Sequence, residues 1–168
     1  MRRWIAVPAI AVALVVVATA LAAQPKVTLH TTSLGKVLAD ARGHTLYLFK
    51  ADTSGKSSCY GACAAVWPPF LAGSTPLAGP GVKLSLLHTS KRKDGKLQVT
   101  YAGHPLYFFA QDAKAGQAKG EGITHFGGSW WAVGATGTAI KPVATSNAGG
   151  PGMSTTTPIV TYPNGDGY

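Results

Sequence analysis

Carboxylate side chains are scarce in this chain of 168 residues. It has only 6 Asp and Glu residues against 15 Lys and Arg, and charged residues make up 12% of the total. So few carboxylates exclude an acidic disordered protein, and they exclude a long helix or coiled coil laced by ion pairs. The length is that of one small domain rather than of a multi-domain enzyme.

The sequence also lacks the common catalytic and nucleotide-binding motifs. It has no Gly-x-Ser-x-Gly segment, so hydrolysis by an activated serine is poorly supported. It has neither a P-loop nor a dinucleotide-binding fingerprint, and no thioredoxin-like pattern surrounds its 2 cysteines. The motifs therefore name no substrate and no reaction.

The N-terminus has the pattern of a secretory signal peptide. A basic start, Met1–Arg3, precedes the apolar stretch Trp4–Ala18, and Ala20–Ala22 offers a small-residue cleavage site. We expect residues 1–23 to be a signal peptide and the rest to be exported, to the periplasm or the cell exterior. The alternative is an uncleaved anchor, because Trp4–Ala23 is long enough to cross a bilayer.

Basic residues remain in excess once this segment is removed. Arg2 and Arg3 leave with it, and the remaining basic residues still outnumber the acidic ones about twofold. In an exported protein this charge indicates an anionic envelope polymer or an anionic membrane surface as partner, and no nucleic acid. The densest basic run, Lys91–Lys93, precedes Asp94-Gly95, which predicts a solvated hairpin tip.

An internal repeat is the most informative feature of the chain. The segment Gly43–Asp52 matches Gly103–Asp112, with Gly, His, Leu, Tyr, Phe and Asp identical. Each copy follows an apolar run and a turn, which predicts a β-hairpin whose second strand carries the Leu-Tyr-x-Phe pattern. In such a strand the Tyr and Phe point to one face and the leucines to the other, so both faces are apolar and the strand is expected to be buried.

We therefore expect a mainly β fold, a two-repeat β-hairpin domain with one short helix. The domain is predicted to span residues 27–142, with repeat 1 at about 34–80 and repeat 2 at about 82–134. The segment 143–168 is rich in Ser, Thr, Gly and Pro and is predicted to be a disordered tail.

The helix is predicted between the two copies, from Cys59 to Val66. Ser57 or Ser58 is positioned to cap it, because a hydroxyl can accept from the first free backbone N–H groups of a helix. It must end near Trp67, since two prolines follow.

The repeat resembles a family of exported bacterial proteins known as the secreted repeat of unknown function, or predicted lipoproteins with a Tyr-x-(Phe/Trp/Tyr)-x-x-Asp motif. Both copies fit this motif, and three further segments look like other marks of the family: Cys59–Cys63, Trp67–Pro69 and Gly128–Trp131. The resemblance runs from about Leu34 to Val133. The resemblance implies the fold and an exported location, and it leaves the activity open. The chain departs from the family name because it lacks a lipid-attachment cysteine.

Cys59 and Cys63 allow two interpretations. An exported chain with two cysteines usually pairs them, which predicts a structural disulfide. Alternatively, two thiolates and an imidazole suit copper, so that Cys59, Cys63 and His104 form a metal site, with His44 as the other candidate imidazole. The protein would then be a periplasmic copper-binding or redox protein.

The equivalent polar residues of the two copies are candidates for a binding site. His44 and His104 either converge on a ligand between the repeats or pack as turn residues. Asp52 and Asp112 either close turns by accepting backbone N–H bonds or serve as the acid and base of a hydrolase of envelope polymers.

We expect an exported, envelope-associated binding or structural protein without catalysis and without a cofactor. Of the adjacent pair Trp130 and Trp131, one side chain is expected to be exposed, because neighbouring strand residues face opposite sides. The candidate ligand-binding residues are His44, His104, Asp52, Asp112, Tyr47, Tyr107 and Trp130.

Overall fold

The computed structural model describes residues 24–141. The expected signal peptide (1–23) and tail (143–168) lie outside the described residues. Within the described part no helix is long and apolar enough to cross a bilayer. In chain order the elements are β1 (Lys26–Thr32), β2 (Gly35–Ala39), β3 (Tyr47–Phe49), α1 (Ala62–Val66), β4 (Leu77–Ala78), the 3-10 helix η1 (Leu84–Leu86), β5 (Leu87–Lys91), β6 (Leu97–Tyr101), β7 (His104–Pro105), β8 (Thr124–His125) and β9 (Gly128–Ala132).

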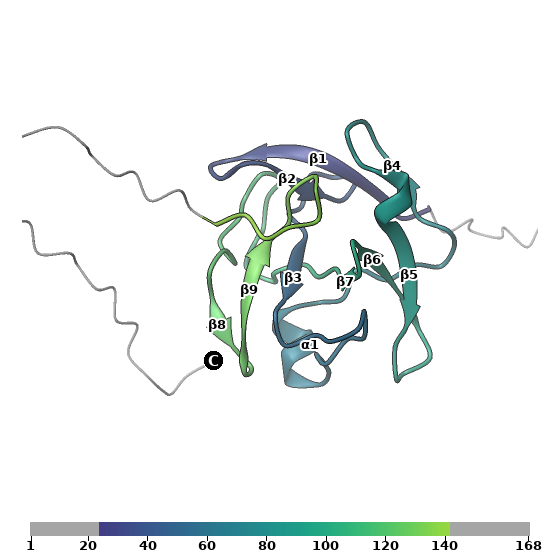
Figure 1. Cartoon of the computed structure of the whole chain (residues 1–168). Helices are drawn as coiled ribbons and strands as arrows, with labels where there is room; N and C mark the ends of the chain where they lie inside the picture. Colours follow the sequence, from purple (N-terminus) through teal and green to yellow (C-terminus); the bar gives the residue numbers. More distant parts are fainter. Residues whose placement is uncertain (1–23, 142–168) are drawn as a thin grey trace, which may run out of the picture.

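The strands form three small sheets, in the orders β2-β1-β4, β3-β9-β8 and β5-β6-β7. Figure 1 shows the β1–β2 hairpin arching over one end of the molecule and α1 at the other end. The β8–β9 and β5–β6 hairpins stand on opposite sides, with β3 between them (Figure 1). The predicted fold class, mainly β with two repeats and one short α-helix, is confirmed.

Each copy of the repeat begins with a hairpin whose second strand turns back into the motif. In the first copy β2 pairs with β1, and the Leu46 N–H then donates to the Leu38 carbonyl at 2.8 Å. In the second copy β6 pairs with β5, and the Leu106 N–H donates to the Val99 carbonyl at 2.9 Å. The two motif segments therefore start from equivalent positions.

Strand β3 separates two hydrophobic clusters. Leu46 and Leu48 belong to one cluster, while Tyr47 and Phe49 belong to the other, and none of the four is more than 2% exposed. This is the alternation expected of a strand with two apolar faces. The second cluster holds most of the large aromatic rings of the domain and is the one that contains the disulfide.

Helix α1 is shorter than predicted. It covers Ala62–Val66 and has no side-chain cap, so the predicted start at Cys59 and the serine cap are wrong. Ser58 is drawn away because its N–H and hydroxyl both donate to Asp52 Oδ1, each at 2.8 Å. Ser57 takes part in a buried network described below. The helix ends at Val66, ahead of the two prolines, as predicted.

Candidate functional site

The two copies of the motif meet at their tyrosines. The Tyr47 N–H donates to the Tyr107 carbonyl at 2.9 Å, and the Tyr107 N–H donates to the Tyr47 carbonyl at 3.0 Å. This antiparallel bridge sets equivalent residues of the copies against one another. A contact from a residue of the first copy to the second copy is therefore matched by the equivalent contact from the second copy to the first.

The motif side chains cross between the copies. The Tyr47 hydroxyl donates to Asp112 Oδ2 at 2.6 Å, and the Tyr107 hydroxyl donates to Asp52 Oδ2 at 2.6 Å. Both tyrosines are 0% exposed. Each tyrosine thus finds its acceptor in the other copy, and four of the predicted site residues are brought together as two crossed pairs.

A stack of four aromatic rings lies in the same cluster. Its neighbouring ring centroids are 4.0 Å apart for Phe49 and Trp130, 4.0 Å for Trp130 and Trp67, and 4.4 Å for Trp67 and Phe109. The order is symmetrical, because the motif phenylalanines are at the ends and each copy supplies one tryptophan to the middle. The expectation that Trp130 or Trp131 is exposed is wrong, because Trp130 is fully buried in this stack and Trp131 is half-buried.

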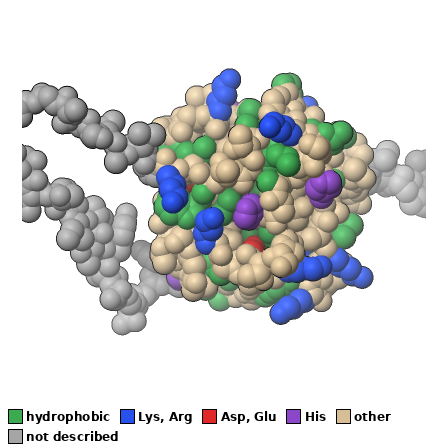
Figure 2. Space-filling view, in the orientation of Figure 1, with side chains coloured by type: hydrophobic (Ala, Val, Ile, Leu, Met, Phe, Trp, Pro, Cys, Tyr) green, Lys and Arg blue, Asp and Glu red, His purple; other side chains and the backbone are tan. Residues whose placement is uncertain are grey.

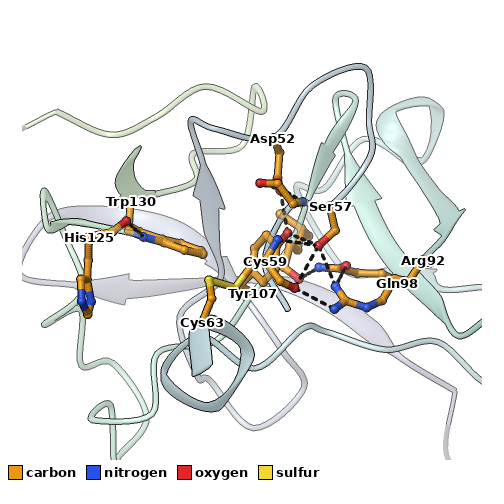
Figure 3. Close-up of a disulfide and its surroundings, with 11 residues drawn as sticks. Asp52, Ser57, Cys59, Cys63, Arg92, Gln98, Tyr107, His125 and Trp130 are labelled. Atoms are coloured by element: carbon orange, nitrogen blue, oxygen red, sulfur yellow. Dashed lines mark hydrogen bonds between the residues drawn. A yellow bond between two sulfur atoms is a disulfide. The ribbon is translucent and has the colours of Figure 1, made fainter. Parts of the chain in front are cut away.

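One of the crossed pairs carries an additional buried network, drawn in Figure 3. The Arg92 guanidinium donates to Ser57 Oγ at 2.8 Å, to Gln98 Oε1 at 2.6 Å and to the Cys59 carbonyl at 2.8 Å. Ser57 Oγ in turn lies 2.8 Å from the Tyr107 hydroxyl. A buried cation is therefore joined to the crossed pair through one serine.

Arg92 corrects the prediction of a solvated hairpin tip. Lys91 and Lys93 are exposed, but Arg92 is only 5% exposed and its guanidinium lies 4.4 Å from the centre of the Tyr60 ring. Arg92 lies just beyond the end of β5 (Leu87–Lys91), beside the turn at Asp94-Gly95, and its side chain turns inward while those of Lys91 and Lys93 point to solvent. Nothing in the sequence marks Arg92 as the buried member of the basic run, and nothing marks Ser57 or Gln98 as its partners.

The other crossed pair has backbone donors instead of a cation. Asp112 Oδ1 accepts the Lys119 N–H at 2.9 Å, and the Tyr47 hydroxyl accepts the Gly120 N–H at 3.2 Å. A cavity of about 260 Å³ adjoins this pair. It is lined by Asp40, Arg42, His44, Thr45, Phe108, Phe109 and Asp112.

The two predicted histidines have different surroundings. His44 lines the same cavity as Asp112, and its Nδ1 lies 3.4 Å from Asp40 Oδ2. Burial lowers the pKa of His104, the charge of Lys50 lowers it further, and the charge of Asp52 acts in the opposite direction. His44 therefore adjoins the crossed pair of Tyr47 and Asp112, whereas His104 is influenced by the charge of Asp52 in the other pair.

The tyrosine hydroxyls of the crossed pairs have raised pKa values. Burial is the main reason that the pKa of Tyr47 and the pKa of Tyr107 lie far above the usual 10.0, and the neighbouring carboxylate adds to each shift. Burial also raises the pKa of Asp52, although hydrogen bonds from Tyr107 and Ser58 oppose that shift.

Cys59 and Cys63 form a disulfide, with their Cα atoms 5.3 Å apart. A disulfide has no thiolate to offer a metal ion. Among residues 24–141, no three His, Cys, Asp or Glu side chains are grouped so that they could hold a metal ion. The set of Cys59, Cys63 and His104 is therefore not assembled as a metal site in this oxidised form.

Replacing both cysteines by serine is expected to lower the free energy of unfolding by about 2 kcal/mol, the entropic value for a very short loop. The change is measured by urea denaturation, with the wild-type protein in dithiothreitol as the matched control. Two results together would contradict the structural role and support the copper alternative. The reduced wild-type protein would bind copper and the double variant would not, and the two proteins would be equally stable.

Comparison with known proteins agrees with this architecture. The doubled motif and the three small sheets define a two-repeat β domain. A family model described as a secreted repeat of unknown function matches residues 28–70 and 88–134, together more than half of the chain. The chain belongs to this family of exported proteins. No curated protein and no solved structure matches it.

Proposed function

We propose that the protein is a non-catalytic binding module that holds an anionic polymer of the cell envelope through its surface lysines. The distribution of charge carries this proposal. Of the five acidic residues between positions 24 and 141, only Asp94 is exposed. Over the same range, every basic residue except Arg92 is exposed: Lys26, Lys36, Arg42, Lys50, Lys56, Lys83, Lys91, Lys93, Lys96, Lys114, Lys119 and Lys141.

The carboxylates are turned inward because they bond to the domain itself. Asp52 and Asp112 hold the crossed pairs, Asp40 accepts the N–H groups of Arg42 and His44 at 2.9 Å each, and Glu121 accepts the Ala132 N–H at 2.7 Å. The described residues form two ion pairs, and neither uses a lysine. Figure 2 shows the result on one face, where blue side chains are widely spread and almost no red is visible.

The bonding of the aspartates supports a binding role over the hydrolase alternative. Asp112 is 8% exposed, and each of its carboxylate oxygens already accepts a hydrogen bond from the protein. Both oxygens of Asp52 are also occupied, by Tyr107 and Ser58. A general acid or base must reach a bound substrate, whereas the oxygens of these two carboxylates are already hydrogen-bonded within the domain.

An anionic envelope polymer is the partner that suits an exported cationic surface. Exposed lysines attract phosphate or carboxylate groups at long range, and this attraction is screened by salt. A polymer with repeated charges can contact several lysines at once, which raises its overall affinity. We infer a location on the outer side of the cytoplasmic membrane, where charge retains the protein at the envelope.

The protein is expected to bind poly(glycerol phosphate) at 20 mM NaCl and to lose at least tenfold in affinity by 300 mM NaCl, because the lysine contacts are screened. Replacing Lys91, Lys93 and Lys96 by Gln should weaken binding by about tenfold at low salt, since each exposed lysine near an anionic surface contributes about 1 kcal/mol or less. Isothermal titration calorimetry measures both effects.

Leu84→Ala, which changes an exposed residue without changing the charge, is the matched control. Equal binding to dextran, or no binding to the phosphate polymer at low salt, would contradict the proposal. Binding to phosphatidylglycerol vesicles but not to the polymer would assign the lysines to a membrane surface instead.

A further inference from the structure

The β5–β6 hairpin ends in a basic tip, residues 91–96, in which four of the six residues are Lys or Arg. The three lysines are exposed, whereas Arg92 is buried. The carboxylate of the tip, on Asp94, is engaged within it, because its Oδ1 accepts the Lys96 N–H at 3.2 Å and its Oδ2 lies 3.5 Å from Arg92 Nε. The three lysines have no carboxylate partner among residues 24–141.

The basic tip is held against the body of the domain by the disulfide loop, residues 59–63. The Lys93 N–H donates to the Tyr60 hydroxyl at 3.0 Å, and the Arg92 guanidinium donates to the Cys59 carbonyl at 2.8 Å. The disulfide closes this loop at the start of α1, and Figure 1 shows α1 and the basic tip at the same end of the molecule. A turn between two strands is usually among the more mobile parts of a fold, and this one is anchored outside its own hairpin.

Tyr60 contacts two cations of the basic tip with one aromatic ring. The centre of the ring is 4.4 Å from Arg92 Cζ and 5.8 Å from Lys93 Nζ. A cation within about 6 Å of a ring centre is attracted to the face of the ring. Lys93 is therefore restrained at its N–H and at its ammonium group, which lowers the conformational entropy that it loses when it binds an anion.

We propose that the basic tip is the site at which the envelope polymer is held, and that Tyr60 is the residue that positions it. The three exposed lysines contact successive phosphate or carboxylate groups of the polymer, while Arg92 holds the tip to the disulfide loop. Several cations close together suit a ligand whose negative charges repeat along a chain. Outside this hairpin, no six consecutive residues between positions 24 and 141 contain more than two Lys or Arg.

This inference rests on the proposed function and narrows it from the surface charge as a whole to one set of residues. It also gives the disulfide loop a role in binding besides its role in stability. A diffuse attraction to the surface depends on how many lysines are removed, whereas binding at a site depends on which lysines are removed. The two can therefore be separated by variants of equal charge.

The first test compares two triple variants of the exported chain that lose the same charge. Replacing the three lysines of the basic tip by Gln should weaken binding of poly(glycerol phosphate) about tenfold at 20 mM NaCl. The matched control replaces Lys36, Lys114 and Lys119 by Gln, which are also exposed and lie outside the hairpin. It should weaken binding less than about threefold, because these charges act only at a distance from the site. Isothermal titration calorimetry measures both affinities.

The second test removes the contacts of Tyr60 without changing the charge. Tyr60→Leu should weaken polymer binding at least about threefold, and Tyr60→Phe, which keeps the ring and loses the hydroxyl, should lie between Tyr60→Leu and the wild type. The affinity of both variants should keep the salt dependence of the wild type, because no charge is lost. Phe126→Leu, which removes an exposed ring outside the tip, is the matched control and should bind as the wild type does. Urea denaturation checks that each variant is folded in the assay.

Two results would overturn the inference and leave the proposed function in place. One is an equal loss of affinity in the two triple variants, which would mean that the polymer responds to the charge of the whole surface. The other is a folded Tyr60→Leu variant that binds the polymer as tightly as the wild type, which would remove the positioning role of Tyr60. A wild-type protein that does not bind the polymer at low salt would instead contradict the proposed function itself.

Discussion

Replacing Arg92 by leucine is expected to lower the free energy of unfolding by about 3–5 kcal/mol, the usual result of removing one member of a buried charged network. The substitution would remove the guanidinium that donates to Ser57 Oγ, to Gln98 Oε1 and to the Cys59 carbonyl. It would also remove the positive charge that helps to keep Asp52 ionised. Urea denaturation followed by circular dichroism measures the change.

Lys93→Leu is the matched control, because Lys93 adjoins Arg92 in the sequence but is exposed. Its effect should stay within about 0.5 kcal/mol. Arg92→Lys should fall between the two, since lysine keeps the charge but cannot reproduce the several fixed donors of a guanidinium. If Arg92→Leu were no more destabilising than Lys93→Leu, the buried network would have no role in stability.

Raising the pH above 10 is expected to unfold the domain by ionising tyrosines. The pKa of Tyr47 and the pKa of Tyr107 are raised in the folded state, so these groups stay protonated while the same groups of the unfolded chain lose their protons. The unfolded state then binds fewer protons than the folded state, and stability falls as the pH rises through this range. Each pH unit removes about 1.4 kcal/mol per tyrosine, or about 5 kcal/mol for the pair by pH 12.

Absorbance at 295 nm, recorded together with circular dichroism, tests this expectation. Two of the 6 tyrosines should ionise only when the β signal is lost. Tyr60→Phe, outside the crossed pairs, should leave the midpoint of the transition in place. Ionisation of all the tyrosines near pH 10 with the fold intact would show that the crossed pairs do not retain their protons.

The sequence predicts the local features of this fold because its signals are local. The repeated Leu-Tyr-x-Phe segment indicates a buried strand with two apolar faces, and the alternation seen at Leu46–Phe49 bears this out. The strand β1 was not expected, although Val27 and Leu29 alternate with polar residues in the manner of a half-buried strand. The start of α1 was misplaced because the Ser58 side chain has a stronger competing partner in Asp52.

The sequence singles out candidate residues but does not predict how they are arranged. The repeat identifies Tyr47, Tyr107, Asp52 and Asp112 as equivalent positions, and it cannot say whether each tyrosine pairs within its own copy or with the other. That choice depends on how the two motif strands meet at the Tyr47–Tyr107 bridge, which is a tertiary contact. The left-handed backbone at Phe126 in the β8–β9 turn is not predicted either, because a positive φ at a non-glycine residue has no signature in the sequence.

The crossed pairs also determine how the chain can reach its native state. The bonded tyrosines and aspartates are 65 and 55 positions apart, so neither bond can form until both repeats are in place. Folding should therefore be cooperative over the whole domain and slow compared with the closure of its hairpins. A single repeat would be half of a core, and two separate copies would be expected to associate as a twofold dimer through the same bonds. Duplication within one chain replaces that concentration-dependent association by an intramolecular one.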